Sequence, residues 1–306
     1  MRFERLAPAK VNLFLHVGAL QADGYHPVSS LMTFADVGDV LSIEPWPRMA
    51  FAIEGPMRAE LNASDDNLVV RAREVALRTF DRDWWPFRLT LDKRLPIAAG
   101  VGGGSADAAA ALVLMGQMFH FPFDPRPADI PDDVETETEA LRRIAGELGA
   151  DVPICLMDGA RLASGRGDVF DYPPPFPALD AVLVNPGVPC PTGQVFRGYD
   201  DDGAPGGAAP PDLPPPMQSA LEVAEFLSRC RNDLQKPAVR LVPQVGEVLQ
   251  TLEGEPETLI ARMSGSGATC FALCPDGDAA RDLALRLGDV RRDWWVRSCR
   301  LQGFCP

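Results

Sequence analysis

The segment Arg94–Leu112 constrains the fold of this chain more strongly than any other, because it joins a glycine cluster directly to a run of alanines. It reads "RLPIAAGVGGGSADAAAAL" and has four glycines within five residues. Glycine loses more conformational entropy on folding than any other residue, so a cluster at this position needs a steric reason. We predict a strand before the loop and a helix over 106–119, capped by Ser105 and carrying Asp107 in its first turn.

Phosphate binding is one reason for such a loop, and three sequence patterns can provide it. A Walker A loop needs a lysine before Ser105, where Gly104 stands, and a G-x-G-x-x-G fingerprint needs a third glycine where Ser105 or Asp107 stands. A nest of backbone N–H groups at a helix N-terminus needs no side-chain cation, and it fits. Close packing of a helix start against a neighbouring strand explains the glycines equally well, so both interpretations stay open.

Length and charge limit the kinds of protein that the chain can form. With 306 residues, of which 46% are hydrophobic, it exceeds the usual size of one core, so we expect two domains with a boundary near residue 160. The formal net charge of −14 opposes binding to nucleic acid or to anionic membranes through a basic surface. An anionic ligand must therefore be bound by local features of the chain.

We expect a cytoplasmic protein without a membrane partner. No apolar run approaches the roughly 20 residues of a membrane span, and the first residues lack the apolar core of a signal peptide. Seven scattered cysteines, the absence of a Cys-x-x-Cys pair and only three histidines argue against a disulfide framework and against a zinc site. Reduced, mostly buried thiols are the simpler interpretation, and the sequence identifies no protein ligands for a metal.

Periodicity and turn signals predict an α+β protein. A turn at Asp23-Gly24 follows the first strand, and Asp65 or Asp66 caps the first helix. The predicted strands lie within 9–17, 33–45, 48–55, 86–96, 160–172, 179–187, 261–274 and 294–302, and the remaining helices within 67–79, 139–149, 217–230, 238–252 and 278–288. The Pro-rich segments 121–139 and 201–216 are predicted surface loops, the second of them mobile, and neither is assigned a function.

Three separated segments resemble the sequence motifs of the GHMP kinases. They are "APAKVNLFLHVGALQADGYHPVSSL" (7–31), "LPIAAGVGGGSADAA" (95–109) and "MSGSGATCFAL" (263–273), and they occur in the order typical of that family. The resemblance implies a two-domain α+β fold, with an N-terminal ATP-binding domain over 1–160 and a ferredoxin-like C-terminal domain over 161–306. It also implies an active site in the cleft between the two domains.

The resemblance implies an activity as well. It is strongest to the branch that phosphorylates the 2-hydroxyl of a CDP-linked methylerythritol in non-mevalonate isoprenoid biosynthesis, with ATP as co-substrate and Mg²⁺ as its counter-ion. The implied partners are small molecules, and the chain is expected to be a monomer or a homodimer. The alternatives are a sibling kinase acting on mevalonate, homoserine or a sugar, and a non-catalytic nucleotide-binding relative. A dehydrogenase is disfavoured because the loop lacks the third glycine.

Two residues are predicted to carry the chemistry. Lys10 is one of only three lysines in the chain and precedes a strand, which suggests a specific anionic partner rather than a solvated surface position. Asp151 lies between a predicted helix and an apolar stretch, where an unpaired carboxylate is costly to bury. The resemblance makes Asp151 the general base and Lys10 its neighbouring cation; a helix-capping aspartate and a strand-edge lysine are the structural alternatives.

The remaining site residues are also implied by the resemblance. The positions that match the ATP-binding motif, with three weaker candidates on the adenosine side at the end, are Pro96, Ile97, Ala98, Ala99, Gly100, Val101, Gly102, Gly103, Gly104, Ser105, Ala106, Asn67, Leu68 and Lys93. Ala98, Ala99 and Val101 stand where glycine or leucine is commoner in the family, and Ala106-Asp107 where Ser-Asn is usual. The positions that match the substrate-binding residues are Asn12, Tyr25, His26, Thr192, Phe196, Gly265 and Ser266. Among these, Tyr25 and Phe196 are expected to sandwich cytosine, and His26 to contact its polar edge.

Overall fold

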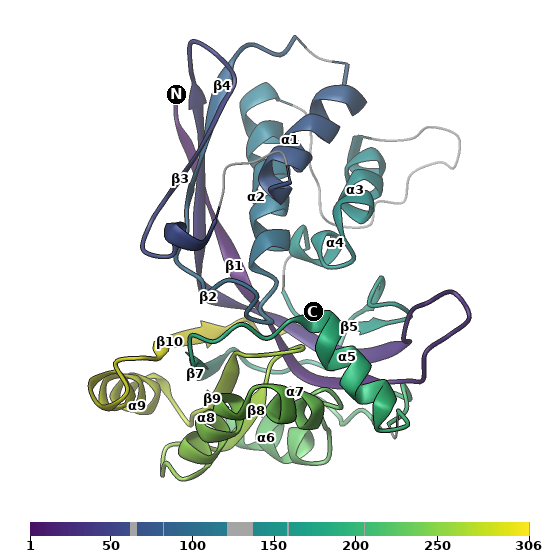
Figure 1. Cartoon of the computed structure of the whole chain (residues 1–306), viewed down its shortest axis with the longest axis vertical. Coiled ribbons are helices and arrows are strands. Elements are labelled where there is room, and N and C mark those ends of the chain that lie inside the picture. Colours follow the sequence, from purple (N-terminus) through teal and green to yellow (C-terminus); the bar gives the residue numbers. More distant parts are fainter. Residues whose placement is uncertain (62–65, 82, 121–136, 158, 205, 306) are drawn as a thin grey trace. The chain divides into compact units, whose positions relative to one another are not determined.

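The computed structural model describes the chain except for residues 62–65, 82, 121–136, 158, 205 and 306 (Figure 1). Its residues form two compact units. Unit 1 consists of Met1–Ala9, Gly38–Leu95 and Gly102–Asp158, and unit 2 of Lys10–Val37, Pro96–Val101 and Gly159–Pro306. Both units combine separate stretches of the chain, so they do not correspond to a single boundary at residue 160. The division into domains 1–160 and 161–306 stays a prediction.

Two long strands contribute residues to both units. They are β1 (Phe3–Val17) and β2 (Val28–Pro45), and they pair with each other. In unit 1, the end of β2 pairs antiparallel with β4 (Phe87–Asp92), which pairs parallel with β3 (Ala50–Glu54). Along β4, buried residues alternate with half-buried ones, which matches the period of two in its sequence "FRLTLD".

Helix α2 (Gly103–Phe119) is the central helix of unit 1. It contacts α1 (Leu68–Thr79), α3 (Glu137–Leu148) and α4 (Val152–Cys155), and Figure 1 shows α1 and α2 side by side. Every residue from 106 to 116 is buried, as expected for a helix whose sequence is apolar on all sides. That run includes one carboxylate, on Asp107, which therefore requires a partner. A short 3-10 helix, η1 (Arg58–Glu60), lies between β3 and α1.

Unit 2 contains an antiparallel sheet with helices packed on it. Its strands follow the order β10 (Trp295–Leu301), β7 (Leu179–Asn185), β9 (Cys270–Leu273) and β8 (Ile260–Met263), and the first part of β2 pairs with β5 (Arg161–Ser164), which pairs with β6 (Val169–Asp171). The helices are α5 (Thr192–Asp201), α6 (Ala220–Ser228), α7 (Gln235–Leu241), α8 (Pro243–Glu253) and α9 (Gly277–Val290). Helix α9 packs on β7 and β10, and α8 packs on β8 and β9.

Two predicted helix caps are wrong. Helix α1 is capped by Asn67, whose side-chain oxygen accepts the N–H of Val69, and not by Asp65 or Asp66. Helix α2 begins at Gly103, three residues earlier than expected, and its N-cap is Gly102 in the left-handed conformation. The reason is steric, because glycine reaches φ 63° at little cost, so the helix starts before the serine. Ser105 therefore lies inside the first turn. Helices α4 and α5 were not predicted, and the predicted helix 238–252 covers the end of α7 and most of α8.

The two predicted loops have different outcomes. Most of 121–139 lies outside the described residues, and its end forms the start of α3. The segment 201–216 begins with the last residue of α5, and two of its described residues hydrogen-bond to other parts of unit 2. The N–H of Gly206 is donated to the hydroxyl of Tyr199, and the carbonyl oxygen of Ala209 lies 2.9 Å from Nδ1 of His16. Its backbone thus has fixed partners although its sequence lacks apolar residues for a core.

The cysteines are reduced, as predicted. None of the seven forms a disulfide, and all except Cys305 are buried. Burial raises the pKa of the Cys274 thiol to about 12, which keeps it protonated and unreactive. Among the described residues, we find no helix with the length and apolar character that crossing a bilayer requires.

Arg262 is a buried cation that stabilises unit 2. Its guanidinium donates to the carbonyl oxygens of Leu13 at 2.9 Å, Leu227 at 2.7 Å and Cys230 at 2.8 Å. Leu13 lies in β1, Leu227 near the end of α6 and Cys230 just after that helix, so one side chain on β8 links β8 to two other segments. Burial lowers the pKa of Arg262, but an arginine stays charged at neutral pH.

Replacing this arginine should therefore cost much stability. Arg262→Met removes three buried hydrogen bonds from a charged donor, and the carbonyl of Leu227 keeps only the N–H of Cys230. A hydrogen bond to a charged group contributes about 1.5–3 kcal/mol, so we expect the free energy of unfolding to fall by about 3 kcal/mol or more. Denaturant unfolding followed by circular dichroism measures the change. Arg281→Met on the exposed face of α9 is the control, with an expected change within about 0.5 kcal/mol. A loss below about 1 kcal/mol for Arg262→Met would contradict this role.

Candidate active site

The glycine cluster divides into positions with different steric demands. The chain passes from unit 2 to unit 1 between Val101 and Gly102. In unit 2, a Cβ on Gly100 would lie 2.6 Å from the carbonyl oxygen of Ser264 and 2.7 Å from that of Gly267. Close packing therefore explains Gly100. Ala98 has φ 51°, a left-handed conformation that costs a non-glycine residue roughly 1–2 kcal/mol.

Gly104 is different, because no atom of unit 1 requires a glycine there. A Cβ at this position would make only an ordinary contact of 3.4 Å with Cδ1 of Leu68, and Gly104 is exposed. Its place in the first turn of α2 means that its N–H has no partner within the helix. A residue kept small without a steric reason inside the protein suggests that a ligand approaches the backbone closely at that point.

The first turn of α2 offers several such N–H groups together. Gly103, Gly104 and Ser105 are its first residues, and the first N–H that donates back within the helix is that of Ala106, to the oxygen of Gly102. Free N–H groups and the positive end of the helix dipole favour an anion. The start of α2 can therefore bind a phosphate without any side-chain cation.

A buried cluster of charges lies behind this helix start. Nζ of Lys93 donates to Oδ2 of Asp39 at 2.5 Å and to Oδ2 of Asp107 at 3.0 Å. Burial alone would lower the pKa of Lys93, but the two carboxylates outweigh burial and raise it. Burial raises the pKa of Asp107 to about 7, with Lys93 acting against that shift and Asp39 adding to it. The side chain of Lys93 thus has two carboxylate partners inside unit 1.

In unit 2, the predicted substrate residue Asn12 is almost fully buried. Its backbone N–H donates to Oγ of Ser264 at 3.1 Å, and its side-chain amide donates to Oγ of Ser30 at 2.8 Å. Its Oδ1 is buried without a hydrogen-bond partner among the described residues, and a Cβ on Gly265 would lie 3.4 Å from it. The structure therefore brings Asn12 together with the "SGSG" turn.

The other predicted residues of this turn have close partners too. The hydroxyl oxygens of Thr192 and Ser266 are 2.8 Å apart, and the thiol of Cys190 donates to the carbonyl oxygen of Ser266 at 3.3 Å. Gly265 has φ 57°, and its carbonyl oxygen accepts from the amide of Asn232 at 2.8 Å. Thr192, Gly265 and Ser266 thus form one polar turn region at the start of α5.

His26 and Phe196 are neighbours, as a base-binding role requires. Their ring centroids are 5.0 Å apart, and Tyr199 packs edge-on against His26 at 6.0 Å. Nδ1 of His26 lies 2.9 Å from the carbonyl oxygen of Gly18, and Nε2 lies 3.5 Å from a carboxylate oxygen of Asp200. The carbonyl oxygen can only accept, so the proton of that contact is on Nδ1, and Nε2 faces the carboxylate of Asp200.

Tyr25 has an exposed ring and a partner that the sequence did not suggest. The guanidinium carbon of Arg166 lies 4.5 Å from the centroid of the Tyr25 ring, and Arg166 also pairs with Asp23 at 2.7 Å. The guanidinium therefore covers one face of the ring. The ring of Tyr25 therefore packs against the guanidinium of Arg166, whereas the ring of Phe196 packs against that of His26.

The two predicted catalytic residues lie in different units, and each is described within its own unit. Lys10 is buried in β1 of unit 2, and its backbone N–H donates to the carbonyl oxygen of Val101 at 2.8 Å. Asp151 stands at the N-cap position of α4 in unit 1, yet its side chain makes no capping hydrogen bond to that helix. The capping alternative for Asp151 is thus not supported. Asn67 has a capping role, and Leu68 lies beside Gly104.

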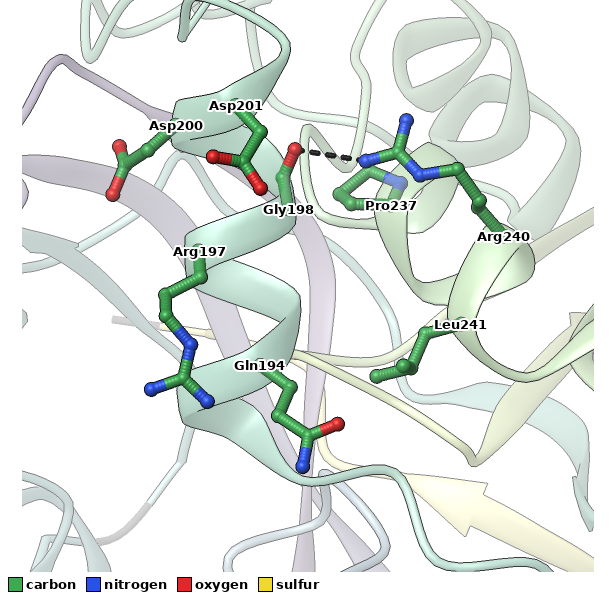
Figure 2. Close-up of a pocket in the computed structure, with 8 residues that line it drawn as sticks. All are labelled: Gln194, Arg197, Gly198, Asp200, Asp201, Pro237, Arg240 and Leu241. Atoms are coloured by element: carbon green, nitrogen blue, oxygen red, sulfur yellow. Dashed lines mark hydrogen bonds between the residues drawn. The ribbon is translucent and has the colours of Figure 1, made fainter.

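A separate surface pocket of about 480 Å³ lies between α5 and α7 in unit 2 (Figure 2). Arg240 donates there to the carbonyl oxygen of Gly198 at 2.9 Å and pairs with Asp202 at 2.7 Å. Figure 2 shows that Asp200 points away from Arg240. None of the residues predicted from the sequence lines this pocket, and we assign it no role.

The described part of the chain holds no group of three or more His, Cys, Asp or Glu side chains that could enclose a metal ion. Mg²⁺ in kinases is commonly bound by substrate phosphates and water together with one or two carboxylates, so such a group is not required. The residues present therefore do not identify a dedicated protein cage for the ion.

Sequence reasoning missed three charged residues of these regions. Asp39 lies within the apolar stretch "ADVGDVLSI", where a carboxylate signals a buried partner. Arg166 lies in the predicted strand segment 160–172 and was not singled out, and Asp200 lies at the end of a helix that was not predicted. The signal for Asp39 was present in the sequence, whereas the partners of the other two depend on long-range contacts.

Comparison with known proteins identifies the family. Residues 67–159 match the model of the GHMP kinases N terminal domain, and residues 217–291 match that of the GHMP kinases C terminal domain. A protein of Caulobacter vibrioides (strain NA1000 / CB15N) named 4-diphosphocytidyl-2-C-methyl-D-erythritol kinase is 52% identical over 302 residues. The match covers 98% of this chain and 100% of that relative.

Solved structures agree with this result. The crystal structure of a 4-(cytidine 5'-diphospho)-2C-methyl-D-erythritol kinase has a TM-score of 0.71 and 32% identity, covering 99% of this chain and 100% of that one. The L. major mevalonate kinase in complex with R-mevalonate has a TM-score of 0.67 at 13% identity, covering 99% and 97%, which shows a shared fold alone. The predicted α+β GHMP kinase fold is confirmed. The chain belongs to the 4-diphosphocytidyl-2-C-methyl-D-erythritol kinases, a branch of the GHMP kinases.

Proposed function

We propose that this chain transfers the terminal phosphoryl group of ATP to the 2-hydroxyl of 4-diphosphocytidyl-2-C-methyl-D-erythritol, giving the 2-phosphate and ADP for isoprenoid precursor biosynthesis. The observation that carries the proposal is 52% identity, over 98% of the chain, to a kinase of that name. Mevalonate, homoserine and sugar kinases remain the alternatives within the fold.

On the donor side, the phosphates of ATP bind at the first turn of α2. Three residues with N–H groups free of helix bonding, Gly103, Gly104 and Ser105, support this role, as does the exposure of Gly104. Leu68 beside Gly104 provides an apolar contact for the nucleotide. Mg²⁺ accompanies ATP in this proposal and neutralises its phosphates, as is general for kinases.

On the acceptor side, His26 recognises cytosine. The polar edge of the His26 ring, where Nε2 lies 3.5 Å from a carboxylate oxygen of Asp200, contacts the polar edge of the base. The ring of Phe196 supplies a stacking surface beside it. Asn12 binds a hydroxyl of the acceptor through Oδ1, whose lone pairs have no partner among the described residues.

Lys10 and Asp151 carry the transfer step. The 2-hydroxyl oxygen forms a bond to the γ-phosphorus as the bond from that phosphorus to the bridging oxygen of ADP breaks, and Asp151 takes the hydroxyl proton. Lys10 stabilises the negative charge on the transferring group. Support for these roles comes from the motif positions of both residues.

A panel of acceptors tests the substrate. With ATP, the purified protein should phosphorylate the CDP-linked methylerythritol and not mevalonate or homoserine. A UDP-linked analogue should have a KM at least about tenfold higher, because uracil presents a carbonyl where cytosine presents an amino group. Coupled ADP release measures each rate. Turnover of mevalonate or homoserine, with none of the CDP-linked alcohol, would replace the proposal with a sibling activity.

Gly104→Ala tests the donor site without disturbing the fold. The new Cβ would meet only Leu68 at 3.4 Å, so the melting temperature should stay within a few degrees, while the methyl group obstructs the phosphates. We expect the Kd for ADP to rise at least about tenfold by titration calorimetry. Gly146→Ala in α3, where a Cβ has no neighbour within 4 Å, is the matched control. Unchanged affinity in Gly104→Ala would rule out phosphate binding at this turn.

Lys10→Met and Asp151→Asn test the chemical step. Each should lower kcat by at least about 100-fold while ADP still binds, because these groups act on the transferring phosphoryl group and the hydroxyl proton. Lys236→Met and Asp289→Asn, both at exposed helix positions, are controls of matched chemistry and should keep the wild-type rate. Rates near wild type in either active-site variant would remove that residue from the mechanism.

A further inference from the structure

A chain of hydrogen bonds connects the two ends of the glycine loop inside unit 1. Before the loop, Oδ1 of Asp39 accepts the backbone N–H groups of Arg94 at 2.6 Å and Leu95 at 2.9 Å. Oδ2 of Asp39 accepts from Nζ of Lys93, which also donates to Asp107 in α2, after the loop. The carboxylate and the ammonium thus link the residues that lead into the loop to the helix that follows it.

This cluster lies directly under the start of α2. A Cβ on Gly103 would be 3.2 Å from Nζ of Lys93 and 3.6 Å from Oδ2 of Asp39. Asp39 is 0% exposed, and Lys93 and Asp107 are each 3% exposed. Burial of charged groups is costly, and a protein in which apolar residues of similar volume replace a buried ion pair is often at least as stable as the original. Stability alone therefore gives little reason for three ionisable side chains at this place.

One carboxylate oxygen of the cluster has no partner. Oδ1 of Asp107 is buried and accepts no hydrogen bond from any described residue. With two carboxylates around one ammonium, the cluster carries a charge of −1 when both are ionised and is neutral when Asp107 holds a proton. The cluster can therefore change its charge immediately behind the helix start.

We propose that Asp39, Lys93 and Asp107 are positioning residues for the nucleotide phosphates: they hold the start of α2 so that the N–H groups of its first turn converge on the phosphates. The inference rests on the proposed function, because it requires the nucleotide at that helix start. None of the three side chains needs to touch the nucleotide. Their effect passes through the backbone of Arg94, Leu95 and α2.

The charge of Asp107 adds a dependence on pH. Burial raises its pKa to about 7, Lys93 at the end of β4 lowers it, and Asp39 on β2 raises it further; these are the charged groups that act on it. The nearby residue of α1, Leu68, is apolar. A negative charge behind the helix start weakens the attraction between its N–H groups and a polyphosphate. Nucleotide affinity should therefore fall as the pH rises through 7.

Asp107→Asn tests this directly, since it keeps the size of the side chain and removes its titration. We measure the Kd for ADP by calorimetry for both proteins at several values between about pH 6 and about pH 8.5. The ratio of the wild-type Kd to the Asp107→Asn Kd should increase roughly threefold to tenfold over this range. The ionisation of ADP itself affects both proteins equally, so it cancels in the ratio.

Asp39→Asn tests the positioning role separately. Asparagine keeps one oxygen for the N–H groups of Arg94 and Leu95 but loses the ion pair with Lys93. The KM for ATP should rise by about tenfold, with kcat changed by less than about twofold. Ile43→Val, a buried residue of the same sheet outside the cluster, is the control for general destabilisation and should leave the KM for ATP unchanged.

The outcomes separate the two proposals. A wild-type protein that binds ADP, but gives a constant Kd ratio across the pH range, overturns the charge effect of Asp107. A KM for ATP in Asp39→Asn within twofold of that in Ile43→Val overturns the positioning role. A wild-type protein that binds no ADP at any pH refutes the proposed function itself, independently of the behaviour of the variants.

Discussion

The unsatisfied N–H groups at the start of α2 are the feature on which the proposed site depends. Four glycines precede or form this helix start, and they serve different purposes. Gly100 allows close packing, Gly102 supplies the left-handed N-cap, and Gly104 keeps the backbone open on its exposed side. Close packing is confirmed for Gly100, whereas ligand approach at Gly104 stays a prediction. A cluster of identical residues can hide several separate constraints.

Periodicity predicted most of the strands and the central helix, because burial of alternating or continuous apolar residues is a local property of the sequence. Helix starts were less predictable. The acidic residues before α1 looked like caps, yet Asn67 takes that position, since the choice among adjacent polar residues depends on where the first turn packs. Helices α4 and α5 are short and their sequences contain Gly, Pro and charged residues, which weakens any helical signal.

In the candidate site, residue types were easier to predict than pairings. His26 and Phe196 were expected near a base, and their rings are neighbours, but the carbonyl of Gly18 that accepts from Nδ1 of His26 could not be inferred from the sequence. Tyr25 has its ring against Arg166, a contact formed by two loops far apart in the chain. Such contacts arise from tertiary structure, so a sequence without aligned relatives carries no direct signal of them.

Two buried cations, Arg262 and Lys93, show why a carboxyl group at the start of α2 titrates near neutral pH. Arg262 is surrounded by neutral carbonyls, which satisfy its donors without adding charge, so burial lowers its pKa while it stays protonated. Lys93 has two carboxylates instead, and these raise its pKa. The excess negative charge then falls on the carboxyl group of Asp107, whose pKa of about 7 leaves it divided between its two forms at neutral pH. A buried cation with one carboxylate too many thus creates a titrating group, whereas a cation held by carbonyls does not.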